Sequence, residues 1–200
     1  KDWKKRRIIE ERWPKILLSP SLVYIPAVTE ISQKMGVESC AQDVSPFERG
    51  AFTGENGAFQ IKVFSKYAII GHSERKEPVE VVARKRDLCL MEKITPIVCF
   101  VNPSDLLRLY KDGCVMAWED PQNISVNGVY RLEDPAKISA IAKEIRKIIP
   151  AEAKLIYGGS VNERNVAAIS RISELDGVLV GNASLDPEIF ATIVRYFVQD

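Results

Sequence analysis

The sequence predicts an α/β protein built on a parallel sheet. Seven short apolar runs alternate along the chain with longer amphipathic segments, joined mostly by short links. The runs are rich in β-branched residues and show no polar/apolar alternation, which is typical of strands buried on both faces. Regular strand–helix alternation of this kind indicates a parallel α/β sheet. The expected strands are residues 16–19, 37–42, 67–71, 95–100, 114–118, 153–157 and 177–180.

Capping residues and apolar spacing predict the helices between these strands. Asp134 and Asp186 each precede a proline, so each is expected to cap a helix that begins at that proline. Asn162 is expected to cap another helix. Met91 is expected to face inward from a helix that ends there. Further helices are expected over residues 2–13, 78–91 and 103–110.

Length, composition and charge narrow the classes of function. At roughly 150 residues per domain, we expect residues 1–200 to form a single domain. An apolar fraction of 46% and a charged fraction of 28% are those of a globular protein and argue against disorder. The net charge of +1 gives no electrostatic reason to expect nucleic acid or an anionic membrane as a partner. No apolar run approaches the roughly 18 residues of a membrane span, so we expect a cytoplasmic protein.

The cysteines predict no metal site. No two of the four form a CxxC pair, and the single histidine is not near any of them in the sequence. Most lie in or beside apolar runs, which indicates buried, reduced thiols. The four are Cys40, Cys89, Cys99 and Cys114.

The strand pattern alone leaves two architectures open. Seven parallel strands fit a doubly wound sheet or a (β/α)8 barrel that lacks one strand. No glycine-rich phosphate loop follows the first expected strand, which counts against a dinucleotide-binding sheet. The longest stretches without periodicity, residues 43–57 and 119–133, both follow expected strands. Barrels carry their chemistry in such loops.

Two side chains at the ends of expected strands are candidates for acid–base chemistry. His72 is the only histidine, and it lies at an expected helix start, where the helix dipole disfavours a second proton. We expect a neutral imidazole that donates a hydrogen bond; the alternative is a core histidine satisfied by its neighbours. Glu119 ends another strand, and apolar neighbours would raise its pKa and suit it as a base. The alternative for Glu119 is a solvated loop acid.

Glycine-containing turns follow the last two expected strands, within residues 157–162 and 177–184. Glycine lets backbone N–H groups approach an anion, and a helix start adds partial positive charge. Two such turns in consecutive units predict a phosphate site of the kind found in many barrels. The alternative is a pair of plain turns.

Six segments of the chain match one known family and occur in that family's order. They are AQD (41–43), GAFTGE (50–55), GHSER (71–75), AWE (117–119), YGGSV (157–161) and GVLVGNASL (177–185). On these segments the chain resembles the triosephosphate isomerases over residues 16–200. The resemblance implies a reduced (β/α)8 TIM barrel with seven strands visible and the first strand absent. It also implies interconversion of dihydroxyacetone phosphate and D-glyceraldehyde 3-phosphate through an enediolate, in glycolysis and gluconeogenesis, without cofactor or metal.

The resemblance also implies a role for each matching residue. Glu119 would be the base that moves the proton, and His72 the neutral electrophile that polarises the carbonyl, the pairing for which this family is known. Glu74 would be a supporting charge, and residues 119–128 would be the lid that excludes water. The substrate phosphate would be held by Ser125, Ser160, Gly181 and Asn182.

Residues 50–55 would be a dimer loop in a homodimer whose substrate is a small phosphorylated triose. Thr53 would steady the neighbouring subunit's site, and Glu55 would pair with the partner subunit's Arg75. No nucleic-acid or membrane partner is expected.

The chain departs from the family pattern at four places. The family's opening strand ends in Asn-x-Lys, and only Lys4 bears a faint likeness to that lysine. Ser125 replaces a lid glycine, Asp43 replaces the usual asparagine, and the helix between residues 100 and 114 is trimmed. The start at Lys1 favours a missing N-terminal piece. These departures leave an alternative open: an impaired or incomplete barrel that binds phosphorylated ligands or a partner chain.

Overall fold

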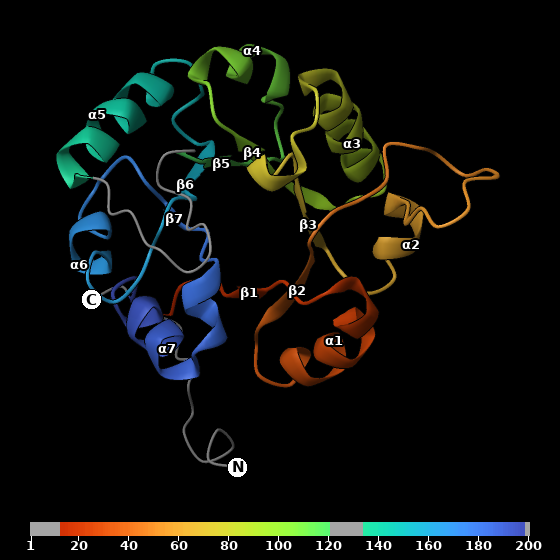
Figure 1. Ribbon diagram of the computed structural model, residues 1–200, viewed down its shortest axis with the longest axis horizontal. Coiled ribbons are helices and arrows are strands. Elements are labelled where there is room, and N and C mark those ends of the chain that lie inside the picture. Colours follow the sequence, from red (N-terminus) through yellow and green to blue (C-terminus); the bar gives the residue numbers. More distant parts are fainter. Residues whose placement is uncertain (1–12, 121–133, 199–200) are drawn as a thin grey trace.

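The strands form one parallel sheet in the computed structural model, which describes residues 13–120 and 134–198. Each strand pairs with the next one along the chain, from β1 to β7. Figure 1 shows the strands near the centre, with the helices arranged around them. The strands are β1 (Leu17–Leu18), β2 (Glu38–Ala41), β3 (Tyr67–Ile70), β4 (Thr95–Phe100), β5 (Val115–Trp118), β6 (Lys154–Tyr157) and β7 (Gly177–Val178).

This strand order decides between the two architectures that the sequence left open. A doubly wound sheet reverses its strand order at a switch point, whereas a barrel adds each strand beside the last. The order here is strictly sequential, and no pairing joins β1 to β7 within the described ranges. The prediction of a reduced barrel with seven strands is therefore confirmed. The predicted opening helix over residues 2–13 lies almost wholly outside the described residues.

The helices begin largely where capping chemistry places them. The Asp134 carboxylate accepts the N–H of Ala136 at 2.9 Å, and Asp186 caps the last helix in the same way. Both predicted Asp-Pro starts are thus confirmed. The helical segments are η1 (Leu22–Tyr24), α1 (Ile25–Gln33), α2 (Ala58–Ile61), η2 (Ser73–Arg75), α3 (Val79–Met91), η3 (Pro103–Asp105), α4 (Leu106–Leu109), α5 (Pro135–Arg146), α6 (Val166–Ile169), η4 (Asn182–Leu185) and α7 (Pro187–Arg195).

Two expectations about helices were wrong, and helix α1 was not expected. Met91 is 62% exposed, because nine residues at roughly 100° each place it on the face opposite Val82. Asn162 does not cap α6: it accepts the N–H of Arg164 at 2.9 Å in the turn before that helix, and Asn165 takes the cap position. Helix α1 was not predicted, because Tyr24 precedes it without a capping side chain.

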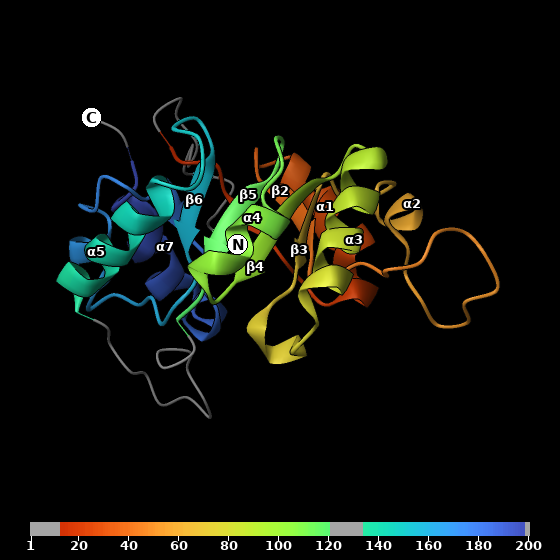
Figure 2. The ribbon, with the colours of Figure 1, turned by 90° about the horizontal axis from the view of Figure 1, so that it is seen from above.

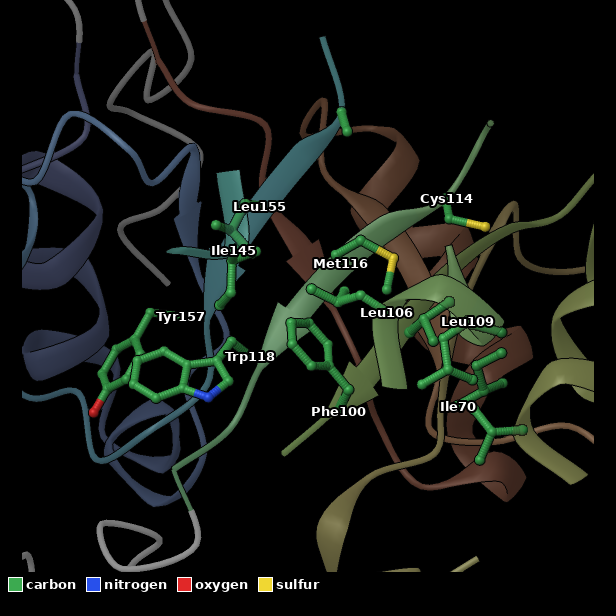
Figure 3. Packing of buried hydrophobic residues seen from close by; sticks show 14 of the residues in the cluster. Ile70, Phe100, Leu106, Leu109, Cys114, Met116, Trp118, Ile145, Leu155 and Tyr157 are labelled. Carbon is green, nitrogen blue, oxygen red and sulfur yellow. The ribbon is translucent and has the colours of Figure 1, made fainter. Parts of the chain in front are cut away.

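Both faces of the sheet are buried. On the outer face, alternate strand residues such as Phe100, Met116 and Trp118 pack against Leu106 and Ile145 of the surrounding helices (Figure 3). The opposite face carries a smaller cluster of short side chains: Cys40, Ile69, Ile97, Cys99 and Ala117. This two-sided burial explains the continuous apolar runs.

All four cysteines are buried free thiols, as predicted. No helix in the described part of the chain is long and apolar enough to cross a membrane.

Candidate active site

The candidate residues gather at the carboxyl end of the sheet. His72 follows β3, Glu119 follows β5, Ser160 follows β6 and Gly181 follows β7. In a parallel sheet these strand ends share one edge, which is where barrels hold their chemistry.

His72 and Glu119 are in direct contact. The imidazole Nε2 lies 3.0 Å from Oε1 of Glu119, although the two residues are 47 positions apart in the sequence. The other ring nitrogen, Nδ1, accepts the backbone N–H of Glu74 at 3.4 Å. Because Nδ1 is assigned as an acceptor, Nε2 is assigned as the nitrogen that carries a proton and donates it to the carboxylate. The expected donor role of His72 fits this arrangement.

Glu119 is buried, with 1% of its surface exposed. Its Oε2 accepts the backbone N–H of Ser73 at 2.9 Å, and its Oε1 accepts the Ser73 hydroxyl at 3.3 Å. The Cys99 thiol also hydrogen-bonds to this carboxylate. Burial raises the pKa of Glu119 above its ordinary value, while His72 and the hydrogen bonds of Ser73 and Cys99 oppose that rise. Glu119 is therefore no solvated loop acid.

Gly158 allows the end of β6 to pack against the acid. A Cβ at this position would lie 3.0 Å from Cγ of Glu119 and 3.4 Å from the carbonyl oxygen of Trp118. The backbone N–H of Gly158 donates to that same carbonyl at 2.8 Å. The small residue thus keeps Glu119 in its position between the ends of β5 and β6.

Ser73, Cys99 and Gly158 were not assigned roles from the sequence. Ser73 had a visible signal, since it directly follows His72 at a helix start. Cys99 was interpreted only as a buried thiol, and its inward direction is set by its position in β4. Their shared contact with Glu119 is a tertiary feature that local pattern does not reveal.

The candidate phosphate-binding residues lie at the same edge. Ser160 is 7% exposed, and its carbonyl oxygen accepts from Asn165 Nδ2 at 2.6 Å. Gly181 and Asn182 lie at the start of η4, just past β7. A Cβ at Gly181 would meet no atom within 4 Å, so the space beside this residue is open. Ser125 lies outside the described residues, as do residues 121–128 of the expected lid.

Glu74 is exposed beside the His72–Glu119 pair. Its Oε2 lies 3.7 Å from Nδ1 of His72, and three-quarters of its side chain (76%) is open to solvent. Lys4, the weak candidate for a catalytic lysine, lies outside the described residues.

The expected dimer loop extends away from the body of the molecule, in orange in Figure 2. Thr53 and Glu55 are exposed on it, and Phe52 stacks on Phe47 with ring centroids 4.4 Å apart. Arg75 contacts Asp43 of its own chain at 2.9 Å.

No group of three or more His, Cys, Asp or Glu side chains in residues 13–120 and 134–198 is arranged to hold a metal ion. The described residues at this edge of the sheet supply a carboxylate, an imidazole and backbone N–H groups.

A sequential parallel sheet with a buried carboxylate and an imidazole at its carboxyl edge defines a (β/α)-barrel enzyme equipped for proton transfer. A sequence model of the triosephosphate isomerase family matches residues 4–197. The chain belongs to the triosephosphate isomerase family.

Individual relatives agree with the family model. The triosephosphate isomerase of Mycobacterium tuberculosis (strain ATCC 25618 / H37Rv) is 35% identical over 184 residues, which cover 76% of this chain and 70% of the relative. The enzyme of Mycobacterium sp. (strain JLS) is 34% identical over 80% of this chain and 73% of the relative. The enzyme of Thermodesulfovibrio yellowstonii is 29% identical over 90% of this chain and 84% of the relative.

Proposed function

We propose that the chain interconverts dihydroxyacetone phosphate and D-glyceraldehyde 3-phosphate, with Glu119 as the base and His72 as the electrophile. The observation that carries this assignment is the 3.0 Å contact between His72 Nε2 and a carboxylate that is 1% exposed. Family membership supplies the reaction, an aldose–ketose isomerisation. Retention of both groups in contact favours the enzyme over a barrel that only binds ligands.

Glu119 removes a proton from the carbon beside the substrate carbonyl, and the electrons move onto the carbonyl oxygen. The Nε2–H of His72 donates to that oxygen as its negative charge develops, which stabilises the enediolate. Glu119 then returns the proton to the neighbouring carbon. In the same step the hydroxyl proton of the first carbon moves, by way of His72, to the former carbonyl oxygen, so that one carbonyl and one hydroxyl exchange places. Burial supports the first step, because it raises the pKa of Glu119 and makes the carboxylate a stronger base.

The phosphate group of the substrate is held at the ends of β6 and β7. Ser160 and the backbone N–H groups of Gly181 and Asn182 form this site, together with Ser125 from the lid over residues 119–128. Glycine turns at strand ends suit an anion because backbone N–H groups can approach it closely. Lid closure excludes water from the enediolate. Glu74 acts as a supporting charge at the site, with its Oε2 3.7 Å from Nδ1 of His72.

The protein works as a homodimer in the cytoplasm. The projecting loop supports this assembly, because Phe52 is 42% exposed at its tip and would be covered by a second subunit. Thr53 reaches the neighbouring site, and Glu55 pairs with the partner subunit's Arg75. Sedimentation analysis tests the assembly, and a single species of 22.5 kDa would contradict it.

The decisive experiment is an isomerisation assay of the purified chain with glyceraldehyde 3-phosphate, beside Glu119→Gln prepared in the same way. The amide keeps the shape of the side chain and removes the base. A catalytic base contributes about 10²- to 10⁴-fold, so we expect turnover to fall by at least about 100-fold. Equal turnover of the two proteins would refute the assignment of Glu119.

A further inference from the structure

Four charged side chains beside η2 form a cluster and take no part in the chemistry described above. Lys85 of α3 is 0% exposed, and its Nζ donates to both carboxylate oxygens of Asp43, at 2.7 and 2.8 Å. It also donates to Oε1 of Glu77 at 2.6 Å. Arg75 contacts the same two acids, at 2.9 Å and 3.2 Å. These four residues, Asp43, Arg75, Glu77 and Lys85, are referred to below as the Lys85 cluster.

The Lys85 cluster is balanced in charge but expensive to bury. Removing an ammonium group from water costs several kcal/mol, and apolar replacements of buried ion pairs are often neutral or stabilising. Burial raises the pKa of Asp43 despite its two cationic neighbours, which shows how strongly the site is desolvated. A gain in stability is therefore a weak explanation for four charges at this position. A better explanation is that the charges select one conformation of the segments that carry them.

The cluster joins three elements that converge on the catalytic pair. Asp43 follows β2, Lys85 comes from α3, and Arg75 is the last residue of η2. Between Arg75 and Glu77 the backbone passes through Lys76 in the left-handed region, with φ of 52°. This sharp turn lets the two side chains on either side of it meet. The cluster therefore holds the carboxyl end of η2 from both sides.

The other end of η2 holds the catalytic groups. His72 directly precedes it, and the N–H of Glu74 donates to the imidazole. The N–H and the hydroxyl of Ser73 both donate to Glu119. Displacement of this one-turn helix would consequently change the orientation of the electrophile and of the base together.

We propose that Lys85 is a positioning residue that holds η2, and through η2 the His72–Glu119 geometry, by clamping the two acids that bind Arg75. This inference rests on the proposed function for its kinetic consequence and on geometry for its structural one. Lys85 acts through Asp43, Glu77 and Arg75, and touches no reacting atom.

The test replaces Lys85 in a charge-balanced background. Lys85→Met alone leaves two acids facing one arginine. It is expected to lower stability, because breaking a buried ion pair leaves one charge buried without a compensating charge. Lys85→Met/Asp43→Asn removes one charge of each sign, so it should recover most of that stability while the clamp stays absent. A misplacement of about 1 Å costs about 100-fold in rate, and we expect kcat of the double variant to fall about 10- to 100-fold, with KM changing less.

A matched control is available at the opposite end of the sheet. Arg146 donates to Asp176 at 2.7 Å and to the carbonyl oxygen of Ala153 at 2.6 Å, before β6 and β7 begin. Its side chain is 20% exposed. Arg146→Met makes the same kind of change in a comparable ion cluster, and it should alter stability without altering kcat.

Nuclear magnetic resonance supplies a readout that does not depend on turnover. His72 is the only histidine in the chain, so an untagged protein gives one set of imidazole signals. We expect these signals to shift or broaden in Lys85→Met/Asp43→Asn and to match the parent in Arg146→Met. Changed signals with an inactive parent would refute the proposed function but uphold the positioning of His72. Unchanged signals, or an unchanged kcat in an active parent, would overturn the role of Lys85.

Discussion

Replacing Gly158 by alanine tests how tightly Glu119 is held. The new Cβ would lie 3.0 Å from Cγ of Glu119, and ordinary contact begins at 3.4 Å. The acid must therefore move by about 0.4 Å, because the other near neighbour, the carbonyl oxygen of Trp118, belongs to the sheet backbone. Such a shift would change the geometry of the 3.0 Å contact with His72, whose strength depends on distance and angle.

The expected effect on catalysis exceeds the effect on folding. If about 1 Å of misplacement costs about 100-fold, 0.4 Å should lower kcat about 5- to 10-fold. Overpacking costs about 1–3 kcal/mol, and the reduced entropy of the unfolded chain returns about 0.4–1 kcal/mol. We therefore expect a loss of about 0–2.5 kcal/mol in the free energy of unfolding.

The assay combines steady-state kinetics with chemical denaturation. Gly177→Ala is the matched control: it changes a glycine of the neighbouring strand, where the nearest atom would be Ile156 Cγ2 at an ordinary 3.5 Å. Its kcat should stay within about twofold of the parent. Parental kcat in Gly158→Ala would show that Glu119 tolerates displacement, and the reasoning from this contact would fail.

Three further predictions follow from particular contacts. Asp186→Ala removes the cap that accepts two N–H groups of α7, at 2.8 and 3.2 Å, and should cost about 1 kcal/mol in denaturant unfolding with unchanged kcat. Because the base must be ionised, kcat/KM should fall as pH drops through the raised pKa of Glu119. Ser73→Ala removes the hydroxyl hydrogen bond to the ionised form, so this acid limb should move to higher pH; an unmoved limb would contradict the assignment. Burial raises the pKa of Cys40 to about 12 and similarly affects the other thiols, so none should react with a thiol reagent at pH 8 before unfolding, as mass spectrometry would show.

The fold was predictable wherever local chemistry determines it. The strand Thr95–Phe100 matches its predicted bounds, because a continuous apolar run buried on both faces carries its own signal. Helices α5 and α7 begin at the prolines that follow Asp134 and Asp186. Helix α1 also has a proline in its first turn, but no side chain caps it and that turn holds no acidic residue.

The site was predictable only in part. The strand-end positions of His72 and Glu119 were visible in the sequence. The order β3-β4-β5 places both residues at the same edge of the sheet. The hydrogen bonds of Ser73 and Cys99 to Glu119 depend on the curl of the sheet, which no local pattern encodes. The same holds for Arg75, which was expected to face a second subunit and also contacts Asp43 of its own chain.

The mutual contact of His72 and Glu119 also bears on selectivity before any chemistry begins. Each group satisfies the other, so an incoming molecule must replace a buried hydrogen bond instead of filling a vacancy. A ligand that offers only an anion at the ends of β6 and β7 has nothing to give the imidazole or the carboxylate. A molecule with adjacent carbonyl and hydroxyl groups can satisfy both at once. The resting contact therefore favours ligands that carry partners for both groups over ligands that carry a partner for only one of them.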